Sequence, residues 1–140
     1  MVEQGTVQAV GFADELYVNS GAEVVSSAAE LFDVAELIIK VKEPQASEVE
    51  LLTSKHTLFT YLHLAPDHDL TDSLIASGAT CIAYETVTDE QGRLPLLAPM
   101  SEIAGRMAVQ AGAHSLEMAA GGRGVLLSGA AGVPAAEVII

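Results

Sequence analysis

The sequence predicts an α/β fold in which an open, parallel, doubly wound sheet is followed by a long connecting helix. Apolar runs of strand length alternate four times with short helical patterns, and the connections between them are short. Parallel strands need a crossover connection, for which a helix is the usual solution. The alternation is therefore typical of β-α-β units with right-handed crossovers.

The individual elements follow from apolar spacing and from residues that start or stop helices. In chain order, we expect a loop or weak strand over 1–11, a helix over 13–20 that Gly21 ends, a strand over 22–25, a helix over 28–34, a strand over 37–42, a short helix after Ser47, a strand over 57–64, a helix after Asp67 and a strand over 80–87. Ser27 and Glu30 have capping-box spacing, which predicts a helix start. Ser47 and Glu50 repeat that spacing. Gly78 is expected to end the helix after Asp67.

The strand over 57–64 is the expected centre of the sheet. Its apolar and β-branched residues run almost without a break, which predicts burial on both faces. His63 stands near its end, and Lys42 ends the preceding strand. Because carboxyl ends of neighbouring parallel strands converge where ligands bind, Lys42 and His63 are candidates for one site. Tyr61 shares a face with His63 and is expected either to touch a substrate or merely to pack.

These candidates also have plainer interpretations. By residue type alone, a lysine at a strand end is usually solvated, and a lone histidine is more often structural. Glu85, near the end of the strand over 80–87, could line the site or pair with a neighbouring basic residue. His68 lies among acidic residues at a helix start, where surface charge is a better explanation than a metal site. We therefore predict no metal site.

The pattern changes after residue 88. Residues 94–99 contain two prolines and are not expected to form a regular helix or a central strand. Ser101 can cap the alanine-rich helix expected over 102–118, whose small side chains permit close packing against another element or subunit. The apolar run Val138-Ile139-Ile140 is expected to be a further strand.

Composition narrows the class of protein. With 50% hydrophobic residues among 140, the chain should fold as a globular protein. Its 19 acidic and 6 basic residues give a net charge of −13, so we expect no nucleic-acid partner. No apolar stretch is of membrane-spanning length, and no signal peptide is indicated. The single cysteine, Cys81, is expected to be a small buried hydrophobe, which favours a cytoplasmic location.

Several stretches resemble the alanine dehydrogenase family, in that family's order and spacing. They are Lys40-Val41-Lys42-Glu43-Pro44, Leu58 to Leu64, Ile82 to Val87, Leu94 to Arg106, Gln110-Ala111-Gly112-Ala113 and Gly121 to Leu126. The resemblance covers nearly the whole chain from about Gly11 onward. The related transhydrogenase domain shares the fold but lacks a histidine placed as in Tyr61-Leu62-His63, so the resemblance favours alanine dehydrogenase.

The resemblance implies a reversible oxidation of L-alanine to pyruvate and ammonia with NAD as cofactor. His63 would be the general acid/base, because an imidazole can give and take protons near neutrality. Lys42 would hold or polarise the substrate, because its ammonium can stabilise a carboxylate or a developing oxyanion. Ser101 would contact NAD, and its expected place at a helix N-terminus would suit a phosphate. The family forms hexamers, so a homo-oligomer is implied.

The chain also departs from the family pattern. A strand-helix unit with a substrate-binding arginine would precede Met1, and a catalytic aspartate would lie in a later half. No GxGxxG fingerprint for NAD occurs in the sequence. We therefore expect residues 1–98 to be a substrate domain incomplete at its N-terminus, and 99–140 to lead towards a missing nucleotide-binding domain. Alone, such a chain is expected to be inactive. The alternatives are a non-catalytic remnant that binds a carboxylate or modulates an oligomer, and a transhydrogenase-like NAD-binding fragment.

Overall fold

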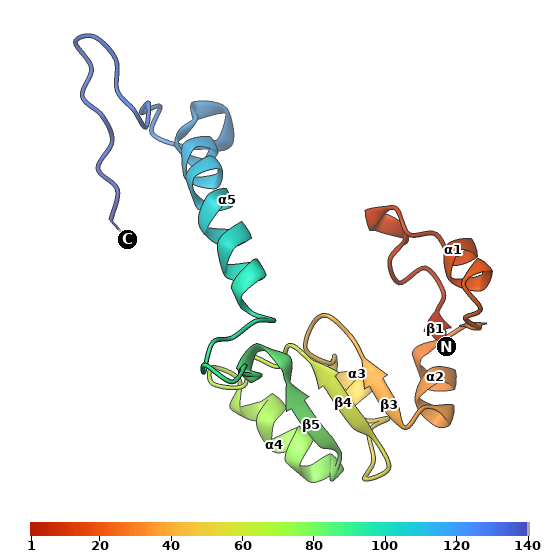
Figure 1. Ribbon diagram of the computed structural model, residues 1–140. Coiled ribbons are helices and arrows are strands. Elements are labelled where there is room, and N and C mark those ends of the chain that lie inside the picture. Colours follow the sequence, from red (N-terminus) through yellow and green to blue (C-terminus); the bar gives the residue numbers. More distant parts are fainter. Residues whose placement is uncertain (140) are drawn as a thin grey trace. The chain divides into compact units, whose positions relative to one another are not determined.

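The computed structural model describes residues 1–139 and divides the chain into two compact units. One unit comprises Met1–Val87 and the other begins at Thr88. Figure 1 shows the helices and strands of both units. Within the described residues, no helix combines the length and the apolar character that crossing a membrane requires.

The first unit alternates strands and helices (Figure 1). Its elements are β1 (Val2–Glu3), η1 (Gln8–Val10), α1 (Asp14–Asn19), β2 (Val24–Val25), α2 (Ala28–Val34), β3 (Leu37–Ile39), α3 (Ala46–Val49), β4 (Thr57–Thr60), α4 (His68–Ser77), β5 (Thr80–Ala83) and η2 (Tyr84–Thr86). All strand pairs are parallel. The predicted α/β class, with helices between parallel strands, is confirmed.

The strands lie in two sheets, a division that the sequence pattern does not predict. One sheet has the order β3-β4-β5, and β1 pairs with β2 in the other. A cavity of about 650 Å³ is lined by residues of both β1 and β3, including Val2, Ile38 and Ile39. Within the described chain, no ladder of hydrogen bonds joins these two strands. The β3-β4-β5 sheet carries the candidate residues that follow its strands.

Two helix starts test the capping predictions. The Ser27 hydroxyl accepts the Glu30 N–H at 3.3 Å, which confirms that cap of α2. The expected box of Ser47 and Glu50 is wrong, because α3 begins two residues earlier. There the Glu48 carboxylate accepts the Gln45 N–H at 2.6 Å and pairs with the Lys40 ammonium at 2.5 Å. The ion pair to Lys40, just after β3, favours Glu48 over Glu50 as the capping acid.

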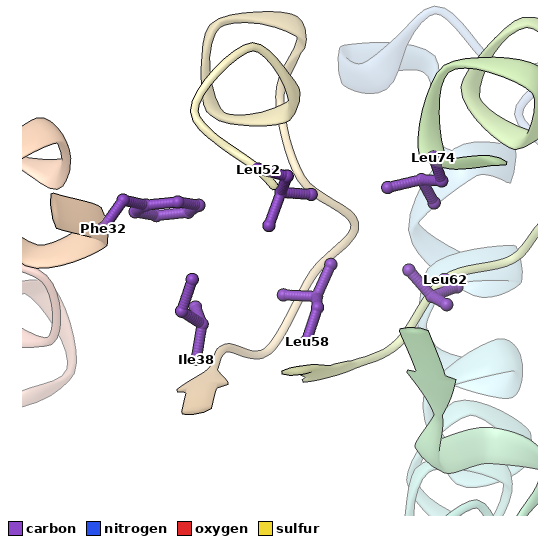
Figure 2. Close-up of a cluster of buried hydrophobic side chains, with 6 residues drawn as sticks. All are labelled: Phe32, Ile38, Leu52, Leu58, Leu62 and Leu74. Carbon is purple, nitrogen blue, oxygen red and sulfur yellow. The ribbon is translucent and has the colours of Figure 1, made fainter. Parts of the chain in front are cut away.

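The core lies on one face of the three-stranded sheet (Figure 2). The cluster of buried side chains consists of Phe32, Ile38, Leu52, Leu58, Leu62 and Leu74. Burial alternates along β4, where Leu58 is buried and Phe59 only half-buried. The register partners of Phe59, Ile39 and Ile82, are 69% and 41% exposed. The expectation that β4 is buried on both faces is therefore wrong, because the cluster covers a single face.

The second unit contains the long helix α5 (Ala98–Leu116) and the short turn η3 (Met118–Ala120). The helix begins before Ser101, with Leu97 as its N-cap and a proline in its first turn. Proline is tolerated there because the first N–H groups of a helix have no intrahelical acceptor. The expected capping role of Ser101 is therefore wrong. Val138 and Ile139 are not in a strand, and Ile140 of the expected final strand lies outside the described residues.

Candidate functional site

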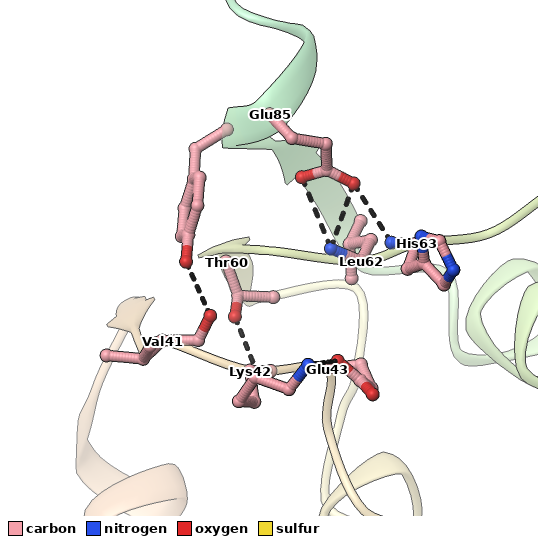
Figure 3. Close-up of polar contacts among 8 residues, drawn as sticks. Val41, Lys42, Glu43, Thr60, Leu62, His63 and Glu85 are labelled. Atoms are coloured by element: carbon pink, nitrogen blue, oxygen red, sulfur yellow. Dashed lines mark hydrogen bonds and ion pairs between the residues drawn. The ribbon is translucent and has the colours of Figure 1, made fainter. Parts of the chain in front are cut away.

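The carboxyl ends of β3, β4 and β5 form one rim, because the three strands are parallel and in register. Lys42 follows β3, His63 follows β4 and Glu85 follows β5. The ladder ends earlier than expected, at Ile39 and Thr60, so Lys42 and His63 stand in irregular backbone beyond the strands. Their positions are held by side chains from neighbouring segments (Figure 3).

The backbone at Lys42 is fixed by two such side chains. The buried Thr60 hydroxyl donates to the Lys42 carbonyl at 2.7 Å, and the Tyr84 hydroxyl donates to the Val41 carbonyl at 2.5 Å. The Lys42 side chain itself is 69% exposed, and its ammonium lies 3.3 Å from the Glu43 carboxylate. The loop is thus held while the ammonium stays accessible.

Tyr61 brings the two predicted residues together. The Lys42 ammonium lies 5.5 Å from the centroid of the Tyr61 ring, within cation-π range. The His63 ring stacks on Tyr61 with centroids 5.8 Å apart and an interplanar angle of 24°. Ammonium and imidazole therefore flank one aromatic ring. The sequence offered only the shared strand face of Tyr61 and His63 as a signal of this arrangement.

Two groups near the rim have shifted pKa values. The pKa of the Glu43 carboxyl is lowered, first by its own backbone N–H and then by the Lys42 ammonium. The pKa of the Tyr84 hydroxyl is raised by burial and, next, by the negative charge of Glu85. Glu43 thus stays ionised beside Lys42, and Tyr84 keeps the proton that it donates to Val41.

Glu85 contacts backbone rather than a basic side chain. Its Oε1 accepts the N–H groups of Leu62 at 3.1 Å and His63 at 2.9 Å, and its Oε2 lies 3.3 Å from the Leu62 nitrogen. His63 has φ of 50°, and every other residue with positive φ in the described chain is a glycine. Glu85 therefore supports the backbone of the candidate acid/base.

The remaining histidines lie elsewhere. His56, which no motif in the sequence singles out, is buried and accepts the Thr53 N–H on Nδ1 at 2.9 Å. His68 is the first residue of α4, and Nδ1 of His114 on α5 lies 3.4 Å from the Glu117 carboxylate. In the part of the chain that the structure describes, no group of three or more His, Cys, Asp or Glu residues could hold a metal ion.

Ser101 belongs to the second unit and is exposed on the first turns of α5. Its N–H donates to the Leu97 carbonyl at 3.1 Å, so that group is not free for a phosphate. The hydroxyl alone remains for a contact.

Comparison with known proteins places the chain in a family. The family model described as "Alanine dehydrogenase/PNT, N-terminal domain" matches residues 1–104. The chain belongs to this family. The match includes the strands β1 to β5 and the rim that follows β3, β4 and β5.

Curated relatives agree with this assignment. An alanine dehydrogenase from Halomonas elongata is 57% identical over 140 residues, which are all of this chain and 38% of that protein. One from Methanococcus maripaludis is 55% identical over 139 residues, covering 99% of this chain and 37% of that protein. The chain thus spans less than two fifths of the length of the curated relatives it matches.

Solved structures show the same fold. An L-alanine dehydrogenase matches with a TM-score of 0.78 and 50% identity, over 95% of this chain and 37% of that one. A transhydrogenase from Sinorhizobium meliloti matches with a TM-score of 0.69 over 83% of this chain and 35% of that one. At 24% identity the transhydrogenase shows likeness of fold alone.

Proposed function

We propose that this chain is the substrate-binding portion of an NAD-dependent alanine dehydrogenase, which interconverts L-alanine with pyruvate and ammonia. The observation that supports this most strongly is 57% identity, over the whole chain, to a protein named alanine dehydrogenase. The 24% identity to a transhydrogenase gives no comparable support for that alternative.

Lys42 is proposed to bind the substrate carboxylate. Its ammonium is exposed, is aimed across the Tyr61 ring and stands on a loop that Thr60 fixes. Because the backbone of this loop is already held, the ammonium can bind an anion without reorganising that backbone. Glu43 offsets part of the Lys42 charge, so a single carboxylate is a better match than a doubly charged anion.

His63 is proposed to be the acid/base. Interconverting an amino acid and a keto acid requires protons to move on the amine and on the water that attacks the imine. An exposed imidazole that flanks the same ring as Lys42 can exchange those protons with a substrate held by its carboxylate. The stacking on Tyr61 limits the orientations of the imidazole.

NAD would accept the hydride in this reaction, and Ser101 is proposed to contact it through its hydroxyl. The roles proposed for Lys42 and His63 are confined to substrate binding and proton transfer, because the sequence contains no GxGxxG fingerprint for NAD. A homo-oligomer, hexameric as in the family, and a cytoplasmic location are part of the same proposal. L-Alanine and pyruvate are the proposed small-molecule partners.

Pyruvate binding to the 140-residue chain tests the proposal. We expect saturable shifts of the amide resonances of Tyr61 and His63 on addition of pyruvate, and their loss in Lys42→Met. Lys55→Met is the matched control. It makes the same substitution at a lysine that precedes β4, whereas His63 follows that strand. The Lys55 ammonium donates to the Asp33 carbonyl at 2.6 Å.

Turnover is measured in parallel as NADH formation from L-alanine and NAD at alkaline pH, where we expect none from the chain alone. Equal pyruvate binding by wild type and Lys42→Met would contradict the substrate role. NADH formation at the rate of an ordinary dehydrogenase would contradict the proposal that these 140 residues are only a portion of the enzyme.

A further inference from the structure

The Glu85 carboxylate accepts backbone hydrogen bonds at the end of the sheet, beside His63. Its Oε1 accepts the N–H groups of two consecutive residues, Leu62 and His63 (Figure 3). Successive backbone N–H groups that point the same way form a concavity that attracts anions. Here an anion of the chain itself occupies that concavity.

The strand register explains why Glu85 reaches this place. Thr60 is paired with Ala83, so two residues further along, Leu62 comes level with Glu85. In a continuing parallel ladder the Leu62 N–H would donate to the Tyr84 carbonyl. That carbonyl instead accepts the Val87 N–H at 3.2 Å, because the chain turns into η2. The Glu85 carboxylate replaces the lost ladder acceptor.

The peptide between Leu62 and His63 has left the geometry of a strand. In an extended strand, successive N–H groups point to opposite sides. Here the N–H groups of Leu62 and His63 both reach Oε1 of Glu85, so the backbone has already turned at Leu62. His63, the next residue, has φ of 50°, in the left-handed region that a residue with a Cβ rarely adopts. Glu85 therefore anchors the peptide nitrogen directly before this left-handed residue.

We propose that Glu85 is the positioning residue of His63, and that its carboxylate anchors the peptide nitrogen of His63 in the place from which the imidazole stacks on Tyr61. Glu85 acts through the backbone and does not touch the substrate. An effect of Glu85 on proton transfer rests on the acid/base role proposed for His63. The placement of His63 by Glu85 does not depend on that role.

The variants follow from the contact geometry. In Glu85→Gln the side-chain carbonyl can occupy the position of Oε1 and keep its two bonds, while the negative charge and the longer bond from Leu62 to Oε2 are removed. Glu85→Ala removes every acceptor. Glu90→Gln, at an exposed acid outside the site, matches the charge change of Glu85→Gln.

The first measurement is amide hydrogen exchange, and it begins with the wild-type chain, so it does not depend on the folding of a variant. We expect the amide protons of Leu62 and His63 to exchange slowly with solvent although both residues lie beyond the end of β4. Glu85→Gln and Glu90→Gln should keep that protection, and Glu85→Ala should lose it. Amide protons of Leu62 and His63 that exchange freely in the wild-type chain would overturn the proposal.

The second measurement reports the imidazole. The ring protons of His63 should show the ring-current shift of a stacked aromatic neighbour in wild type and in Glu85→Gln, and lose it in Glu85→Ala. An unchanged His63 ring shift in folded Glu85→Ala would overturn the positioning role. If the ring shift behaves as expected but wild type binds no pyruvate, the proposed function fails and the positioning role stands.

Discussion

Replacing Thr60 by valine should destabilise the chain through one hydrogen bond. The Thr60 side chain is fully buried, and its hydroxyl donates to the Lys42 carbonyl at 2.7 Å. Valine has nearly the same shape, so no large cavity forms, but the Lys42 carbonyl loses its donor. A buried polar group left without a partner costs about 1–3 kcal/mol, and because this carbonyl is only partly buried we expect about 1.5 kcal/mol.

Urea unfolding followed by far-UV circular dichroism measures this loss. With a slope of about 1.5–3 kcal/mol/M, a loss of about 1.5 kcal/mol lowers the midpoint by about 0.5–1 M. Thr86→Val is the control, because the Thr86 hydroxyl also donates to a backbone carbonyl, that of Ala83 at 2.8 Å, but is exposed. Water can replace that donor, so its cost should stay below about 0.5 kcal/mol. Equal midpoints for the two variants would refute the argument from burial.

Three further predictions concern the core, a helix end and alkaline pH. Leu58→Ala removes a side chain of 0% exposure and should cost about 3–5 kcal/mol, whereas Ile75→Ala, at 73% exposure, should cost less than about 1 kcal/mol in the same urea assay. Gly78→Ala places a Cβ at φ of +71° and should cost about 1–2 kcal/mol. Gly105→Ala, inside α5, should stabilise its helix by about 0.5–1 kcal/mol. Thermal unfolding that ranks these two variants the other way would contradict the prediction. Burial and then the neighbouring Glu85 carboxylate raise the pKa of Tyr84. The folded state therefore holds the Tyr84 proton more tightly than the unfolded state does. The stability gained in this way is complete below about pH 10 and is lost as pH rises through the folded pKa. Tyr84→Phe should flatten this alkaline loss in urea midpoints measured from pH 9 to 11.5.

The sequence predicted the element order well because each element has a local signal. The Ser27 cap, the stop at Gly78 and the apolar runs of β4 and β5 depend on neighbours within a few residues. The prediction failed where a contact distant in the sequence decides the outcome. Glu48 caps α3 in place of Glu50 because its carboxylate also reaches Lys40, eight residues away in the chain.

The candidate site shows the same difference between features that follow from local sequence signals and features that depend on distant contacts. That Lys42 and His63 follow neighbouring parallel strands could be predicted from the sequence, and the structure places both side chains against Tyr61. Their chemical roles stay proposals. The contribution of Tyr61 could not be predicted with the same certainty, because an aromatic residue in a strand run packs in the core more often than it faces a site. The start of α5 at Ala98, before Ser101, could not be predicted in the same way. It depends on the tolerance of a proline in the first turn of the helix, and it leaves Ser101 inside the helix instead of at its cap.

The apolar runs also extend beyond the strands, and this explains how the rim is built. Leu62 is 1% exposed although β4 has ended at Thr60, so burial continues where the ladder has stopped. Buried N–H and carbonyl groups must then find partners other than a neighbouring strand. Thr60, Tyr84 and Glu85 supply those partners from within otherwise apolar stretches. A polar side chain at the carboxyl end of an apolar strand run is therefore a signal of irregular backbone held by side chains. In this chain it indicates which residues fix the site as well as which residues face it.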